Sequence, residues 1–272
     1  FQWCPGIGCR NGVSKMPATD RKRISFLASS TEVAQSAKST FVNQFGDCEL
    51  GKADVIVALG GDGFMLETLN STQHLNIPVY GMNRGTVGFL MNEFSLEHLT
   101  DRLADAEEAV INPLRMHATC ADGITHTELA INEVSLLRQG PQAAKLKIFV
   151  DDRLRLSELH CDGALVATPA GSTAYNYSAH GPILPIGCEV LAITAMAAFR
   201  PRRWRGAVLP KNAKVRFEII EPQKRPVMAD ADSRSVQDVV TVEIESAGDI
   251  EHRLLFDPGH GLEERLIQEQ FA

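Results

Sequence analysis

The sequence has little of what marks nucleic-acid-binding and membrane proteins. Its 34 Asp and Glu residues outnumber 27 Lys and Arg, and a formal net charge of -7 argues against the basic face that nucleic-acid binders carry. The longest apolar run, Val190 to Phe199, is about half as long as a membrane span. We therefore expect a cytoplasmic protein that binds neither nucleic acid nor membrane.

Metal and common nucleotide motifs are missing as well. The six cysteines form no C-x-x-C pair and have no histidine at zinc spacing, so we expect free thiols and assign no metal-ligating residue. The P-loop pattern G-x-x-x-x-G-K-[ST] is absent, because Gly51-Lys52 is followed by Ala53. Gly61-Asp62-Gly63 lacks the third glycine of a dinucleotide fingerprint. A phosphate site would therefore need a different motif.

Such a motif lies in residues 54–69. Val55 to Leu59 is continuously apolar, which predicts a strand buried on both faces, and helical spacing resumes at Phe64. Between them, Gly60, Gly61 and Gly63 would let a phosphate approach the backbone at a helix N-terminus. Asp62 lies inside this turn. A carboxylate beside phosphates is unfavourable unless it accepts a proton, positions a hydroxyl or holds a divalent metal through water.

A purely structural interpretation of this turn stays open. Glycines after a buried strand often form a tight turn, and Asp62 could cap the helix that follows. Short motifs produce false positives, so the turn by itself favours phosphate chemistry without establishing it.

The order of the elements predicts two folded domains. Up to residue 112 strands alternate with helices, which indicates an α/β domain with a parallel doubly wound sheet at 21–112. Short β-like runs separated by turns then predict a mainly antiparallel β domain at 113–250. Residues 251–272 would add a strand and a helix that pack back on the first domain. Residues 1–20 show no periodicity and are expected to be an unstructured leader or tag. The expected elements are strands at 24–28, 54–59, 77–81, 133–138, 146–150, 153–156, 214–220, 238–245 and 252–256, and helices at 29–45, 64–74, 95–108 and 261–270.

A second group of polar residues follows Asp162. The segment Asp162-Gly163 to Tyr175 has the pattern of a buried strand, a glycine turn and a hydroxyl-rich helix start. Hydroxyls and an aromatic ring at a helix start can bond to and stack on a nucleobase. An ordinary helix cap at Ser172 or Thr173, with Tyr175 in the core, explains these residues equally well.

Four segments taken together resemble a known family. Gly60-Gly61-Asp62-Gly63, the run from Asn83 to Leu90, Asn132-Glu133, and Asp162-Gly163 to Tyr175 occur in the order and approximate spacing of bacterial NAD kinases. The resemblance runs from about Ile24 to the end of the chain. It implies transfer of the γ-phosphate of ATP to the 2′-hydroxyl of the adenosine ribose of NAD, giving NADP. It also implies a divalent metal, most often Mg²⁺, and a homodimer or homotetramer.

The resemblance also assigns site residues. It makes Asp62 the catalytic carboxylate and a part of the NAD site, and Gly60, Gly61 and Gly63 the phosphate loop that binds ATP. The NAD site implied by the resemblance comprises Asp62, Gly63, Phe64, Asn132, Glu133, Asp162, Thr173, Ala174, Tyr175, Ser178 and Asp232.

The chain departs from the family pattern at three places. Ser233 follows Asp232 where the family has glycine, Ala170 replaces a frequent threonine, and His180 replaces a frequent glycine. A basic run, Arg200 to Arg205, is either a solvated turn or a phosphate contact across a subunit interface. Two rival functions remain: a lipid or sugar kinase that uses the same GGDG turn, and a non-catalytic NAD(P)-binding sensor.

Overall fold

The computed structural model describes residues 22–85, 88–202, 204–259, 261 and 264. The leader expected at 1–20 lies outside the described residues, as does nearly all of the helix expected at 261–270. The described chain divides into two compact units. The first contains the chain up to Met65, Ile77–Ala109 and Arg253–Gly261, and the second contains Leu66–Asn76 and Val110–His252.

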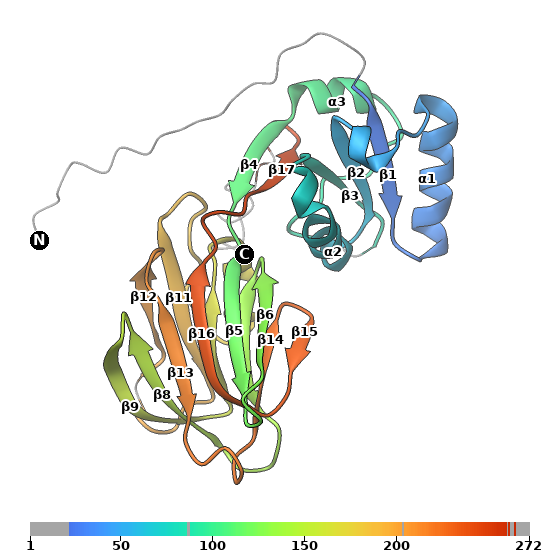
Figure 1. Ribbon diagram of the computed structural model, residues 1–272. Helices are drawn as coiled ribbons and strands as arrows, with labels where there is room; N and C mark the ends of the chain where they lie inside the picture. The colour runs from blue at the N-terminus through green and yellow to red at the C-terminus, as the bar shows by residue number, and fades with distance from the viewer. Residues whose placement is uncertain (1–21, 86–87, 203, 260, 262–263, 265–272) are drawn as a thin grey trace, which may run out of the picture. The chain divides into compact units, whose positions relative to one another are not determined.

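A five-stranded sheet organises the first unit (Figure 1). Its order is β1 (Ile24–Ala28), β2 (Val55–Gly60), β3 (Val79–Asn83), β17 (His252–Phe256) and β4 (Glu107–Ile111). β1, β2 and β3 pair in parallel, and β17 pairs in parallel with β3. Every residue of β2 is buried, as its apolar run predicts for a central strand. The expected parallel α/β domain is confirmed.

The first unit also contains the helices α1 (Glu32–Phe45) and α3 (Leu99–Asp105) and the short 3₁₀ helix η1 (Leu50–Lys52). A further helix, α2 (Asp62–Thr72), begins in this unit directly after β2, and its residues from Leu66 on, with the 3₁₀ helix η2 (Gln73–Leu75), belong to the second unit. Phe41 of α1 stacks on Phe26 of β1 with ring centroids 5.5 Å apart. Leu99 and Leu103 of α3 join the same core. The helix expected at 29–45 begins at Glu32, three residues later than predicted, because the hydroxyl of Thr31 caps it by accepting the Ala34 N–H.

The helix expected at 95–108 is shorter in the structure, and β4 takes its C-terminal end. The Ser95 hydroxyl accepts the Glu97 N–H at 3.1 Å, which makes a local turn, and His98 is left-handed with φ 56°. The helix therefore begins at Leu99. Sheet pairing overrides local helical preference at Glu107–Ile111, since a strand position offers these backbone groups partners in the sheet.

Two six-stranded sheets form the second unit. The first has the order β6 (Thr125–Ala130), β5 (Leu114–Cys120), β16 (Val239–Ser246), β13 (Val215–Ile219), β8 (Ala144–Val150) and β9 (Arg153–Cys161). The second has the order β12 (Gly206–Pro210), β11 (Val190–Met196), β10 (Gly163–Ala167), β7 (Glu133–Arg138), β14 (Val227–Ala231) and β15 (Arg234–Val236). Neighbouring strands are antiparallel, as expected for this part of the chain.

The two sheets lie face to face (Figure 1) and share one apolar core. Met116 of β5 and Phe217 of β13 meet Leu136 of β7 and Val166 of β10 in this core, and all four are almost fully buried. Inward and outward residues alternate along β5 and β8, so one face of the first sheet remains polar. The 3₁₀ turn η3 (Ala170–Thr173) and the short helix α4 (Tyr175–Ser178) follow β10.

Candidate active site

The glycine turn of the first unit connects β2 directly to α2. Gly60 is the last residue of β2, and a Cβ built there would lie 2.8 Å from Phe64 Cβ, so the Phe64 side chain packs where a side chain at residue 60 would project. A Cβ at Gly61 or Gly63 would meet no atom of the described residues within 4 Å. The backbone of this turn is therefore open to a ligand at the N-terminus of an 11-residue helix.

Asp62 is held by a neighbouring turn of the chain. Its Oδ2 accepts the Phe89 N–H at 2.6 Å, and its Oδ1 accepts the Leu90 N–H at 2.9 Å. Each oxygen takes one of these bonds, and a carboxylate oxygen has room for two. The carboxylate is thus oriented by the protein and keeps acceptor capacity for a further group.

The two glycine-containing turns of this unit meet at one edge of its sheet. The Arg84 N–H, just past β3, donates to the carbonyl of Gly60 at 2.7 Å. The guanidinium of Arg84 stacks over the Phe94 ring, 3.7 Å from its centroid. Both turns follow the carboxyl ends of adjacent parallel strands, where α/β sheets generally bind ligands.

In the second unit, Asp232 anchors the Asn132-Glu133 segment. Its carboxylate accepts the backbone N–H groups of Ile131, Asn132 and Glu133 at 2.7, 3.0 and 3.3 Å. Asp232 itself has φ 50°, and its N–H donates to the Glu133 carbonyl at 3.1 Å. Burial nevertheless raises the pKa of this carboxyl, since desolvation outweighs the three bonds. Asp232 therefore shapes the turn that carries Asn132 and Glu133.

The turn after β10 is fastened to the same segment. The Thr168 hydroxyl donates to the Ile131 carbonyl at 2.7 Å, and the Thr168 N–H donates to the Asn132 carbonyl at 2.9 Å. Gly171 lies so close to Asn132, the residue before β7, that a Cβ at position 171 would be 2.2 Å from the backbone carbonyl oxygen of Asn132. A glycine is required there because any side chain would separate the two turns.

Glu133 is a buried carboxyl in this cluster. Only 9% of its surface is exposed, and Oε2 has no hydrogen-bond partner among the residues that the structure describes. Burial, with the nearby charge of Asp232, raises the pKa of Glu133 to about 8, although the backbone N–H of Tyr175 opposes the shift. At neutral pH the side chain is mainly protonated and can donate one hydrogen bond as well as accept others.

An open groove of about 740 Å³ adjoins α4 in the second unit. Asp162, Tyr175 and Ser178 line it, together with Arg138 and His180. Arg138 Nε donates to Asp162 Oδ1 at 2.6 Å, so this carboxylate is oriented by an ion pair. The volume lies in the range of about 300–1,000 Å³ that small-molecule pockets usually have.

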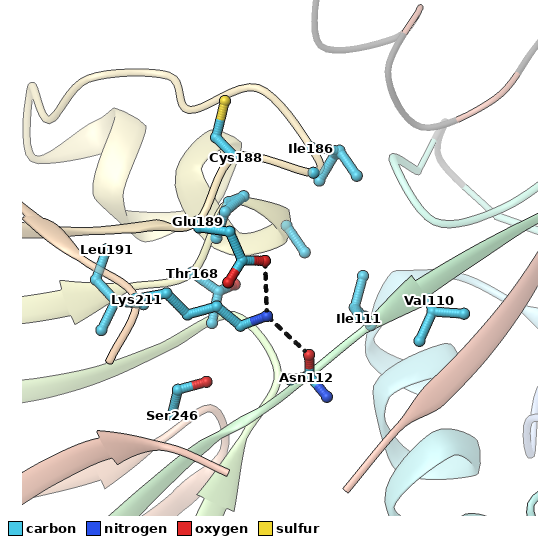
Figure 2. A pocket seen from close by; sticks show the side chains of 13 residues that line it. Val110, Ile111, Asn112, Thr168, Ile186, Cys188, Glu189, Leu191, Lys211 and Ser246 are labelled. Atoms are coloured by element: carbon cyan, nitrogen blue, oxygen red, sulfur yellow. Dashed lines mark hydrogen bonds and ion pairs between the residues drawn. The ribbon is translucent and has the colours of Figure 1, made fainter. Parts of the chain in front are cut away.

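Figure 2 shows another cavity of the second unit, with a volume of about 90 Å³. Lys211 Nζ donates to Asn112 Oδ1 at 3.0 Å and to Glu189 Oε1 at 3.1 Å (Figure 2). The ammonium is therefore already neutralised, and the cavity is well below the roughly 300 Å³ of a typical ligand pocket. Of the residues that the resemblance assigns to NAD, none lines it.

Comparison with known proteins identifies the family. The model of the ATP-NAD kinase N-terminal domain matches residues 12–109, and that of the C-terminal domain matches residues 131–246. An NAD kinase of Cereibacter sphaeroides is 68% identical over 251 residues, which cover 92% of this chain and 99% of that protein. The chain belongs to the NAD kinase family. An NAD kinase of Caulobacter vibrioides is 55% identical over 250 residues, covering 92% of this chain and 96% of that protein.

Solved structures of two NAD kinase relatives share the fold. Yeast NADH kinase complexed with NADH has a TM-score of 0.80 at 21% identity and covers 93% of this chain and 88% of its own. An NAD kinase from Archaeoglobus fulgidus in complex with ATP has a TM-score of 0.70 at 24% identity, covering 90% of this chain and 96% of its own. The α/β and β-rich arrangement is thus the NAD kinase fold.

The residues predicted for the NAD kinase site fall into three local groups. Gly60, Gly61, Asp62, Gly63 and Phe64 share one turn; Asn132, Glu133 and Asp232 share a second cluster; and Asp162, Tyr175 and Ser178 line the groove. Thr173 is the last residue of η3. Ala174 lies between η3 and α4, and its N–H donates to the carbonyl of Gly171 in η3. Among the described residues, no cluster of three or more His, Cys, Asp or Glu side chains could hold a metal. The described helices include none long and apolar enough to cross a membrane.

Sequence reasoning missed several residues that orient these NAD kinase groups. It named the run from Asn83 to Leu90 but did not connect it with Asp62, whose carboxylate Phe89 and Leu90 bind. It also did not assign Arg138 as the partner of Asp162. These contacts join residues 24 or more positions apart, so no local pattern indicates them.

The raised pKa of Glu133 makes a contribution to stability that depends on pH. The folded state holds a proton with a pKa of about 8, against 4.5 when unfolded, so stability is greatest at low pH and falls between pH 4.5 and 8. The glutamine of Glu133→Gln cannot ionise. At pH 8 the unfolding free energy of this variant relative to the parent should therefore be about 4 kcal/mol higher than at low pH. Urea unfolding at pH 5, 6, 7 and 8 measures this.

The exposed Glu243, whose side chain is 61% accessible, provides the matched control for that series. Glu243→Gln should follow the pH profile of the parent. Parallel profiles for Glu133→Gln and the parent would show that Glu133 does not carry the proton.

Proposed function

We propose that the chain transfers the γ-phosphate of ATP to the 2′-hydroxyl of the adenosine ribose of NAD, giving NADP and ADP. The observation that carries the proposal is the oriented carboxylate of Asp62 within an open glycine turn at a helix N-terminus, in a chain of the NAD kinase family. Phosphoryl transfer needs positioning and charge stabilisation more than covalent help from the protein.

In this proposal Gly60, Gly61 and Gly63 form the turn that binds the phosphates of ATP, and the open backbone at Gly61 and Gly63 receives them. In the part of the chain that the structure describes, no atom lies within 4 Å of a Cβ at Gly61 or Gly63, which supports this role. The first N–H groups of α2 have no partner within the helix and carry partial positive charge, which favours an anion.

Asp62 then acts on the nucleophile. As the ribose 2′-oxygen bonds to the γ-phosphorus, the bond from that phosphorus to the β–γ bridging oxygen breaks, and ADP leaves. The hydroxyl proton passes to the Asp62 carboxylate or to a water that it holds. Its two backbone bonds leave one lone pair on each oxygen for this contact.

A single carboxylate in the turn fits Mg²⁺, which prefers to keep several waters and to bind phosphates with one or two carboxylates. Asp62 would hold such an ion together with the ATP phosphates, where it would neutralise charge that develops on them. The two bonds that the described residues make to Asp62, one on each oxygen, leave acceptor capacity that supports this fit.

The second unit supplies recognition of NAD in this proposal. Glu133, mainly protonated at neutral pH, offers one donor and acceptors to a ribose diol, and the Asn132 side chain adds an amide. Tyr175 and Ser178 line a groove large enough for a nucleoside, beside Asp162. Thr173, Ala174 and Phe64 are assigned to the NAD site from the family resemblance, and Asp232 acts by holding the Asn132-Glu133 turn.

The proposal extends to a homodimer or homotetramer and to a cytoplasmic location, both of which rest on the family. The deciding experiment incubates the purified chain with ATP, MgCl₂ and NAD and assays NADP with an NADP-specific dehydrogenase. Omission of MgCl₂ tests the metal, and light scattering gives the number of subunits. Absence of NADP with phosphorylation of a lipid or sugar, or tight NAD binding without ADP release, would favour the two rival functions.

A further inference from the structure

The turn Gly88-Phe89-Leu90 contacts both oxygens of Asp62. Oδ2 accepts the Phe89 N–H at 2.6 Å, and Oδ1 accepts the Leu90 N–H at 2.9 Å. An aspartate side chain rotates about two covalent single bonds. A hydrogen bond to each carboxylate oxygen restricts both rotations. These two backbone donors therefore set the plane and direction of the carboxylate.

Gly88 leaves the space that the carboxylate occupies. A Cβ at residue 88 would lie 2.3 Å from Asp62 Oδ1, 2.8 Å from Cγ and 3.2 Å from Oδ2. Such contacts are much shorter than van der Waals distances. A side chain at this position would force the carboxylate to move, the turn to move, or both.

The turn is itself fixed to the sheet on its C-terminal side. Leu90 and Met91 are almost fully buried, and Met91 Sδ would lie 2.6 Å from a Cβ at Gly81 of β3. The buried Asn92 side chain donates to the carbonyls of Gly81 and Leu255 at 3.0 and 2.9 Å. Because this end cannot easily shift, the Asp62 side chain is the part that a residue at position 88 would displace.

We propose that Gly88 is a positioning residue of the reaction: it allows the turn at 88–90 to hold the Asp62 carboxylate against the nucleophile. The inference rests on the proposed function, in which Asp62 acts on the ribose hydroxyl. It goes further by making turnover depend on a residue outside the set that the family resemblance assigns to the site. A purely structural role for the same turn would affect stability and leave the catalytic constant of the folded enzyme unchanged.

Gly88→Ala tests the proposal. A displacement of about 1 Å at a catalytic group costs about 10²-fold in rate, so we expect kcat to fall by about that factor. The KM values for ATP and NAD should change much less than kcat, because the methyl group displaces Asp62 alone and leaves the other groups proposed to bind the two substrates in place. Circular dichroism and thermal melting establish that the compared proteins are folded.

Gly51→Ala is the matched control, since Gly51 lies in the same unit and a Cβ there would meet no described atom within 4 Å. It should keep the kcat of the parent. A folded Gly88→Ala enzyme with the kcat of the parent would overturn the inference, and so would an equal loss of kcat in Gly51→Ala. In either case NADP formation by the parent would leave the proposed function standing. A parent that forms no NADP would instead overturn the proposed function.

A second comparison covers the case in which Gly88→Ala does not fold. In an Asp62→Ala background the three atoms nearest to the methyl group, Oδ1, Cγ and Oδ2 of Asp62, are gone. The double variant Asp62→Ala/Gly88→Ala should therefore fold and melt close to Asp62→Ala. A double variant that remains unfolded beside a folded Asp62→Ala protein would show that the conflict at residue 88 does not involve Asp62, and the inference would be wrong.

Discussion

Asp62→Asn is expected to lower turnover by about 10²–10⁴-fold, the usual contribution of a positioned acid–base group. The substitution removes the negative charge and puts an amide NH₂ in place of one carboxylate oxygen. That NH₂ would face a backbone N–H of Phe89 or Leu90, so one of the two orienting hydrogen bonds is lost. The loss of one bond to a charged acceptor should also lower the unfolding free energy by about 2 kcal/mol.

Steady-state kinetics with ATP and NAD varied separately measures this effect, and urea unfolding measures the change in stability. Glu67→Gln is the control, because Glu67 is an exposed carboxylate on the same helix, α2. It should retain turnover and stability close to the parent. Parent-like turnover in folded Asp62→Asn would remove Asp62 from catalysis and leave it as an anchor of the turn at 88–90.

Asp232→Ala is expected to affect both folding and the NAD site. It leaves the N–H groups of Ile131, Asn132 and Glu133 without their acceptor in a buried place. Orphaned buried donors cost about 1–3 kcal/mol each, and removal of a desolvated carboxylate offsets part of this. We expect the unfolding free energy to fall by about 3 kcal/mol or more, and NAD affinity by at least about 10-fold, about 1.4 kcal/mol.

Denaturant unfolding and calorimetric titration with NAD measure the two effects of Asp232→Ala. The neighbouring Asp230 provides the control, since its carboxylate accepts the Ser235 hydroxyl and lies in the adjoining strand pair. Asp230→Ala should change stability and affinity far less. Equal effects of the two substitutions would show that the backbone bonds to Asp232 are not what shapes the site.

Much of the fold was predictable because it follows from short-range patterns. The apolar run of β2 is buried along its whole length, and the alternation in β5 and β8 reflects one buried and one polar face. The strand predicted at 252–256 matches β17. Its residues do not indicate which strand it pairs with, and only the structure places it beside β3. The helix predicted at 95–108 was too long because β4 finds its partners in the sheet.

The sequence by itself determined which residues we propose to carry the chemistry. The glycine turn around Asp62, the Asn132-Glu133 pair and the hydroxyl-rich segment before Tyr175 depend on residue type and local spacing, and these can be read along the chain. Tertiary structure alone decided how those groups are held and charged. The bonds from Phe89 and Leu90 to Asp62, and the desolvation that raises the pKa of Glu133 to about 8, arise from segments far apart in sequence. Direction and protonation of a carboxylate depend on what surrounds it in space, and only the folded chain brings those surroundings together.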